Sequence, residues 1–113
     1  MSDEGEGGAE DGREWVRVAD IGDCPTGNLL DVEAGEESIV LANVDGDLYA
    51  LKNRCSHQDL PLSDGEMDGD QLECLYHGAR FDVHTGKAVG LPAIKPVETY
   101  AVELRGQDIY VQI

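Results

Sequence analysis

Two short motifs in this chain combine residue types that bind transition metals. One reads Cys55-x-His57 and the other Cys74-x-x-His77, with residues 58–73 between them. Each motif offers one thiolate and one imidazole. A cluster of two irons and two sulfides can be held by such a set, with two cysteines on one iron and two histidines on the other. We therefore predict that Cys55, His57, Cys74 and His77 bind a [2Fe–2S] cluster of this mixed-ligand kind.

The close spacing within each motif has a physical reason. A single tight loop can direct both of its ligands toward one cluster, so that each loop gives a sulfur to one iron and a nitrogen to the other. Gly78 follows the second histidine directly. A glycine at this position fits a backbone that must turn sharply or pass close to the cluster.

Two other interpretations of the same residues are less favoured. A structural zinc site also takes two cysteines and two histidines, and the chain would then be a zinc-stapled interaction module. Zinc motifs usually pair like with like, as C-x-x-C followed by two histidines, whereas here cysteine and histidine alternate. A catalytic cysteine–histidine pair would not explain why the chain contains two such pairs.

On these motifs the chain resembles the Rieske-type ferredoxins of bacterial aromatic-ring-hydroxylating dioxygenases, from about Trp15 to Ile113. The run Ala79–Gly86 also matches, and the Leu91-Pro92-Ala93 segment is similar to the proline-bearing loop that covers the cluster in that family. The resemblance implies one Rieske [2Fe–2S] cluster per chain. It also implies an all-β Rieske fold, a small antiparallel sandwich with a cluster-binding subdomain of two ligand loops.

The resemblance implies a one-electron carrier rather than an enzyme. Such a carrier receives electrons from an NAD(P)H-dependent flavoprotein reductase and passes them to a terminal oxygenase. The oxygenase itself needs a further iron on two histidines and a carboxylate, but only His84 remains after His57 and His77; we expect His84 at the surface. A Rieske-type small subunit of an assimilatory nitrite reductase is the alternative, because it would share the same ligands.

The same comparison predicts a low reduction potential. High-potential Rieske proteins tie their two loops with a disulfide, whose positions fall here on Leu60 and Tyr76. They also place hydroxyls beside the sulfurs, at positions that are Ala79 and Phe81 here. Fewer donors to sulfur, together with a net charge of −16, disfavour the extra electron. We expect a potential below about 0 mV, near the low end of the Rieske range.

Length and composition limit the possible domain organisation, partners and localisation. A chain of 113 residues is one domain. Residues 1–12 hold five acids and no base, which predicts a disordered acidic tail ahead of a Rieske domain over 13–113. The net charge argues against nucleic-acid or anionic-membrane partners. The sequence shows no signal-peptide pattern and no long apolar run. Outside the ligand motifs only Cys24 remains, which we expect to be a small, partly buried thiol and which fits a reducing compartment. We therefore expect a cytoplasmic monomer.

Period-two patterns predict strands on both sides of the ligand motifs. Before them we expect strands at Trp15–Val18 and Asn28–Glu33, and a hairpin of Ser38–Val44 and Asp47–Leu51 across an Asp-Gly turn. Around the second motif, Gln71–Glu73 leads into Cys74, and Arg80–Val83 leads to a turn at Thr85-Gly86. A second hairpin is expected to join Tyr100–Leu104 to Ile109–Ile113 through Arg105-Gly106. No segment shows a convincing helical period.

Acidic residues crowd the stretch between the two motifs: Asp59, Asp64, Glu66, Asp68, Asp70 and Glu73. A solvated surface segment is the simplest explanation. The alternative is an acidic docking rim around an apolar cap, which would consist of Leu60, Pro61, Leu62, Leu91 and Pro92.

Overall fold

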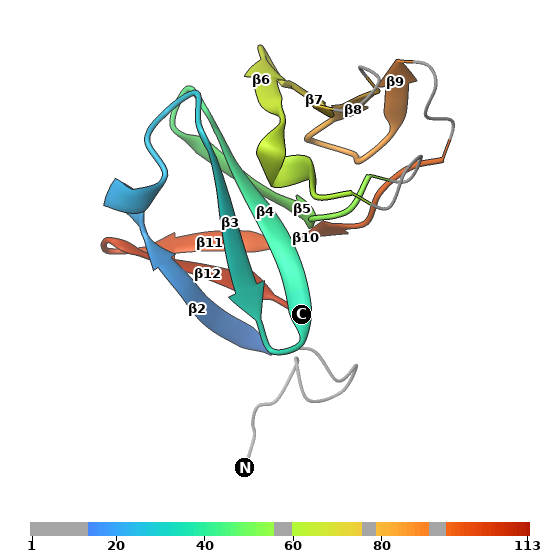
Figure 1. Cartoon of the computed structure of the whole chain (residues 1–113). Helices are drawn as coiled ribbons and strands as arrows, with labels where there is room; N and C mark the ends of the chain where they lie inside the picture. Colours follow the sequence, from blue (N-terminus) through green and yellow to red (C-terminus); the bar gives the residue numbers. More distant parts are fainter. Residues whose placement is uncertain (1–13, 56–59, 76–78, 91–94) are drawn as a thin grey trace.

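The fold consists of antiparallel β-sheets with almost no helix (Figure 1). The computed structural model describes residues 14–55, 60–75, 79–90 and 95–113. Within these ranges the helical elements are two single turns of 3-10 helix, η1 (Ile21–Asp23) and η2 (Leu62–Asp64). The predicted all-β fold class is therefore confirmed. The predicted tail and the two histidine ligands lie outside the described residues.

Three sheets make up the described chain. The first has the order β10-β5-β4-β3, formed by Thr99–Tyr100, Asp47–Lys52, Glu37–Val44 and Leu29–Ala34. The second has the order β11-β12-β2, formed by Val102–Arg105, Asp108–Gln112 and Trp15–Asp20. The third has the order β6-β7-β8-β9, formed by Glu66–Asp68, Gln71–Glu73, Arg80–Asp82 and Ala88–Gly90.

The hairpin of β4 and β5 forms as its sequence predicts. Val44 pairs with Asp47, which leaves Asp45 and Gly46 as a two-residue turn. Both turn residues have positive φ, 54° and 97°, as a type I′ turn requires. The side chain of Asn43 accepts a 2.8 Å hydrogen bond from the Gly46 N–H. The local sequence thus sets the register of the two central strands.

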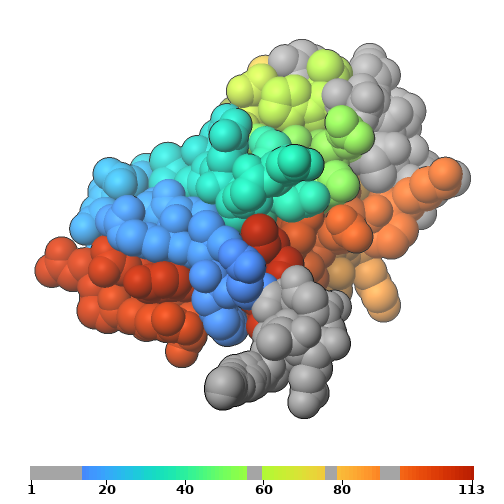
Figure 2. Space-filling model, turned by 90° about the horizontal axis from the view of Figure 1, so that it is seen from below, coloured from blue at the N-terminus to red at the C-terminus, as the bar shows by residue number. Residues whose placement is uncertain are grey.

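Strand β4 is buried on both faces, and this links two separate cores. Ile39 and Leu41 point into a body core between the first and second sheets, whose buried members are Ala19, Cys24, Val32, Ala34, Ile39, Leu41, Ala50, Ile109 and Val111. Val40 and Ala42 point into a site core under the third sheet, whose buried members are Val40, Ala42, Leu51, Cys55, Leu62, Leu72, Cys74, Ala79, Phe81, Val83 and Val97. The third sheet therefore packs directly on the first. Figure 2 shows β2 (blue) beside the C-terminal hairpin (red), with residues of the third sheet's region at the opposite end.

The prediction for the C-terminal hairpin was wrong in two details. The expected strand Tyr100–Leu104 is split, because Tyr100 pairs with β5 of the first sheet while Val102 pairs with β12 of the second. The turn residues are Gly106 and Gln107, one position later than predicted, and Gly106 has a φ of 63°. The chain changes sheets at Ala101, a transition that no period-two pattern reveals.

The cysteine outside the two ligand motifs lies in the body core. Cys24 has no exposed surface, so it is fully rather than partly buried, and burial raises the pKa of its thiol. Cys24, Cys55 and Cys74 form no disulfide with one another. In the part of the chain that is described, no helix has the length and apolarity to cross a bilayer.

Candidate metal centre

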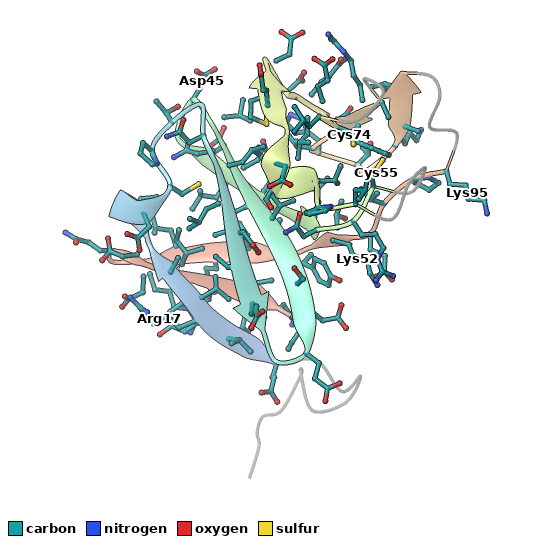
Figure 3. The ribbon with its side chains drawn as sticks, in the orientation of Figure 1. Arg17, Asp45, Lys52, Cys55, Cys74 and Lys95 are labelled. Carbon is teal, nitrogen blue, oxygen red and sulfur yellow. The ribbon has the colours of Figure 1, made fainter. Side chains whose placement is uncertain are left out.

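Cys55 and Cys74, nineteen positions apart in the sequence, belong to one core. Cys55 follows β5 and Cys74 follows β7. Each is 1% exposed, and both pack in the site core. Figure 3 labels the two cysteines on the same side of the molecule, under the third sheet. The structure thus brings together the two thiols that the sequence predicts as ligands.

The two ligand loops are closed in the same way. The Cys55 N–H donates to the carbonyl of Leu60 at 2.7 Å, and the Cys74 N–H donates to the carbonyl of Ala79 at 2.6 Å. In each case the bond joins the cysteine to the residue five positions later. The motifs differ in spacing, C-x-H against C-x-x-H, yet each cysteine stands at the start of a loop of equal length. Both loops thereby present a thiol from equivalent backbone positions.

A buried amide anchors the first loop. The Nδ2 of Asn53 donates to the Ser63 Oγ at 3.0 Å and to the Asp31 Oδ1 at 3.2 Å. The Ser63 N–H in turn donates to the Asn53 Oδ1 at 2.8 Å, and the Asn53 N–H donates to the Ser38 carbonyl at 2.9 Å. Asn53 therefore ties the two ends of the loop to each other and to β3 and β4. Asn53 was not among the predicted site residues; its signal in the sequence is a polar side chain between an apolar strand and a ligand cysteine.

The second loop is held by the pairing of β7 and β8. Leu72 pairs with Phe81 and Glu73 with Arg80, so the strands converge on the loop from both sides. Phe81 and Ala79 have no exposed surface. The positions where high-potential relatives carry hydroxyls are thus buried and apolar here.

A close backbone contact fixes the segment that follows the third predicted loop. The Val97 N–H donates to the Gly86 carbonyl at 2.9 Å, and the Gly86 N–H donates to the Asp82 carbonyl at 2.7 Å. Gly86 has a φ of 79°, and a Cβ there would collide with the Val97 carbonyl oxygen. Only glycine fits this position without strain, so Gly86 joins the β8–β9 turn to the chain at Val97. Leu91 and Pro92 lie outside the described residues.

Three of the six acids between the motifs contact basic side chains on β8 or in the turn that follows it. Arg80 contacts Asp68 at 2.8 Å and Glu73 at 3.4 Å. Asp70 lies 3.6 Å from the Nε2 of His84. His84 is exposed, as predicted, and its ring packs edge-on against Tyr49 at 4.4 Å between centroids. Asp59 lies outside the described residues, so the acidic rim remains a prediction.

The described half of the site fits the predicted cofactor. Soft thiolate ligands suit iron–sulfur clusters, and here two thiols meet in an apolar core at the start of two equivalent loops. His57 and His77 lie outside the described residues. They follow Cys55 by two positions and Cys74 by three, within the segments that the two backbone hydrogen bonds close.

Comparison with known proteins defines the class of this fold and site. Residues 14–101 match the family model of the Rieske [2Fe-2S] domain. The chain is 41% identical over 98 residues to the biphenyl 2,3-dioxygenase ferredoxin component of Rhodococcus jostii (strain RHA1), covering 87% of this chain and 92% of that protein. The chain belongs to the Rieske [2Fe–2S] family, and its cofactor is a Rieske-type cluster.

Solved structures narrow the assignment to the ferredoxins. The Sphingomonas yanoikuyae B1 ferredoxin has a TM-score of 0.83 at 29% identity, covering 88% of this chain and 99% of that one. A chain from a complex of reduced oxygenase and oxidized ferredoxin in carbazole 1,9a-dioxygenase has a TM-score of 0.81 at 32% identity, with 86% and 91% covered. The chain is an electron-transfer ferredoxin, not a catalytic oxygenase. The zinc and nitrite reductase alternatives are not favoured.

Proposed function

We propose that this ferredoxin carries single electrons at low potential from an NAD(P)H-dependent flavoprotein reductase to the terminal oxygenase of an aromatic-ring dioxygenase system. Cys55 and Cys74 supply the thiolates, and His57 and His77 the imidazoles. The Rieske domain spans 13–113, and residues 1–12 are a disordered acidic tail. The protein works as a monomer in the cytoplasm, without nucleic-acid or membrane partners.

One observation carries the proposal. Two cysteines from separate motifs meet in one apolar core, each at the start of a loop closed by the same backbone hydrogen bond. A structural cysteine pair would form a disulfide or need no matching loops. In a Rieske cluster one iron takes two cysteine sulfurs and the other takes two histidine nitrogens. Each loop must therefore supply one ligand to each iron, and two equivalent loops meet this requirement.

The chain's own residues prepare the site for electron transfer. When bound, a Rieske cluster takes up and releases one electron at a time. Leu62, Leu72 and Phe81 have no exposed surface and exclude water from the two thiolates. The closed loops hold the sulfur positions fixed, so little of the surrounding structure needs to rearrange when the charge changes. Leu75, directly after Cys74, is 58% exposed and offers a partner an apolar contact beside the second loop.

The low potential follows from what surrounds the sulfurs. Ala79 and Phe81 provide no hydroxyl donor, and the site core around them is apolar. Hydrogen bonds to cluster sulfurs stabilise the reduced state, and their absence lowers the potential.

An EPR-monitored redox titration of the dithionite-reduced protein tests this function. We expect a rhombic signal with an average g value below that of four-cysteine, two-iron ferredoxins, appearing at a negative potential. The same signal at a strongly positive potential would retain the cluster and refute the low-potential carrier. A metal-loaded but colourless, EPR-silent protein would refute the ligand assignment.

Reconstitution tests the proposed partners. The reduced protein, mixed with the oxygenase component of a biphenyl 2,3-dioxygenase system, should support oxygen-dependent product formation. Equal amounts of a His57→Cys variant, which would change the ligand set, serve as the control. Product formed equally well with the control, or with no ferredoxin, would contradict the role.

A further inference from the structure

Gly65, like Gly86, has no room for a side chain, but its backbone angles are ordinary. Its φ of −87° is one that residues with side chains also adopt. The need for glycine comes from space: a Cβ on Gly65 would collide with the Glu73 carbonyl oxygen and would lie 3.1 Å from the Glu73 carbonyl carbon. One Cα hydrogen of Gly65 therefore faces this oxygen, and the two backbones are in direct contact.

The peptide group that Gly65 contacts leads directly into a ligand. The Glu73 carbonyl and the Cys74 N–H belong to one planar peptide and point in opposite directions. The N–H donates to the Ala79 carbonyl at 2.6 Å and so closes the second ligand loop. The peptide is thus held on one side by this hydrogen bond and on the other by the Gly65 backbone. A displacement of the Glu73 carbonyl would tilt the peptide plane and move the Cys74 backbone with it.

Gly65 also ends the turn that follows the first ligand loop. Its N–H donates to the Leu62 carbonyl at 2.9 Å and caps η2. Leu62 has no exposed surface and packs in the site core, and Ser63 exchanges two hydrogen bonds with the Asn53 side chain. These contacts fix η2 to the first loop. We call Leu62–Gly65 the spacer turn.

The relative position of the two loops depends on noncovalent contacts of this kind. The three cysteines form no disulfide with one another, and the positions of the inter-loop disulfide in high-potential relatives are Leu60 and Tyr76 here. Figure 3 labels Cys55 and Cys74 on the same side of the molecule. The spacer turn is fixed to the loop of the first cysteine and contacts the peptide of the second, so it connects the two thiols through backbone.

We propose that Gly65 is a positioning residue of the metal centre. By bringing the spacer turn into direct backbone contact with Glu73, it sets the separation at which Cys55 and Cys74 bind one iron. The inference rests on the ligand assignment of the proposed function. A side chain at position 65 would push the peptide before Cys74 away from the first loop. Groups that orient metal ligands typically contribute about 10- to 100-fold to metal affinity, so the change should be measurable at the metal.

Gly65→Ala tests the proposal, with Gly69→Ala in the neighbouring β6–β7 turn as the matched control. Gly69 has a φ of 64°, and a Cβ there meets nothing within 4 Å, so alanine strains this turn without pushing on Glu73. We expect Gly65→Ala to shift the EPR g values of the reduced protein and to lose iron to a chelator roughly tenfold faster than wild type. Gly69→Ala should lower the melting temperature but leave the g values unchanged.

Ser63→Ala tests the same turn without adding an atom, and it serves where Gly65→Ala does not fold. The substitution removes the hydroxyl that ties the spacer turn to the Asn53 amide. Ser38→Ala is its control, because the Ser38 Oγ accepts from the same Nδ2 at 3.5 Å but belongs to β4. We expect Ser63→Ala to shift the g values and to speed iron loss less than Gly65→Ala does, and Ser38→Ala to change neither.

Identical g values and iron-loss rates for Gly65→Ala and Gly69→Ala would overturn the proposal, because the collision would then cost only stability. Where Gly65→Ala does not fold, equal effects of Ser63→Ala and Ser38→Ala would overturn it. Failure of the proposed function gives a different result. A wild-type protein without the Rieske signal would refute the ligand assignment and the inference together, whereas a normal wild-type signal that the variants do not alter would refute only the positioning role of Gly65.

Discussion

Asn43 and Asn53 are the two buried polar side chains of the described residues, and they hold different loops. The Nδ2 of Asn43 donates to the Cys24 carbonyl at 2.8 Å, and its Oδ1 receives the turn N–H of the β4–β5 hairpin. Asn53 closes the loop that begins at Cys55, through Ser63. A buried amide that loses such partners costs about 1–3 kcal/mol. Loss of Asn43 should therefore affect only the stability of the fold, whereas loss of Asn53 should also disturb the positions of the metal ligands.

We predict that Asn53→Ala and Asn43→Ala lower the melting temperature by similar amounts, about 4–15 °C. Only Asn53→Ala should also shift the EPR g values of the reduced protein and accelerate loss of iron to a chelator. Asn53→Asp, which keeps the acceptor for the Ser63 N–H but loses the two donors, should fall between wild type and Asn53→Ala. Identical spectra and iron-loss rates for both alanine variants would refute a positioning role for Asn53.

The missing hydroxyls give a second prediction at this scale. Ala79→Ser places a hydroxyl in the site core, at the residue whose carbonyl accepts from the Cys74 N–H. A donor to a cluster or ligand sulfur favours the reduced form, so the potential should rise by tens of millivolts in the EPR titration. Val111→Thr adds a hydroxyl to the body core and should leave the potential unchanged. A potential that does not move with Ala79→Ser would remove the explanation offered for the low value.

At the scale of elements, two glycines with positive φ differ in their surroundings. A Cβ at Gly86 would meet the Val97 carbonyl, whereas a Cβ at Gly46 meets nothing within 4 Å. Alanine at Gly46 should cost only the backbone strain of about 1–2 kcal/mol. Gly86→Ala should cost clearly more, because the contact between the β8–β9 turn and Val97 must open. Thermal unfolding followed by circular dichroism measures both, and equal losses would show that this contact contributes little.

Elements with strong local signals could be predicted from the sequence, and those set by tertiary contacts could not. The Asp-Gly turn fixes the β4–β5 hairpin through its own backbone angles, so it was confirmed. The split between Tyr100 and Val102 was missed, because residues on either side of Ala101 alternate alike while pairing with different sheets. The positions of Cys55 and Cys74 in one core could be anticipated from the motifs. The hydrogen-bond network of Asn53 could not be anticipated, because nothing in the sequence indicates that Asp31 and Ser38 lie beside it.

At the scale of the whole molecule, the proposed tail can be removed. Deleting residues 1–12 takes away five acids and no base, which changes the net charge from −16 to −11. If the tail is disordered, the melting temperature should shift by less than about 4 °C, and the EPR spectrum should be unchanged. A larger loss of stability would show that the domain begins earlier than residue 13.

The two faces of β4 have a consequence for how the protein opens. Val40 and Ala42 support the site core while Ile39 and Leu41 support the body core, so neither core can come apart without uncovering the same strand. Its amide protons should then be among the last to exchange with deuterated solvent, at a rate set by global unfolding. Unfolding that exposes one core to proteases would accordingly expose the other as well, so that the sheets of this ferredoxin come apart together rather than one by one.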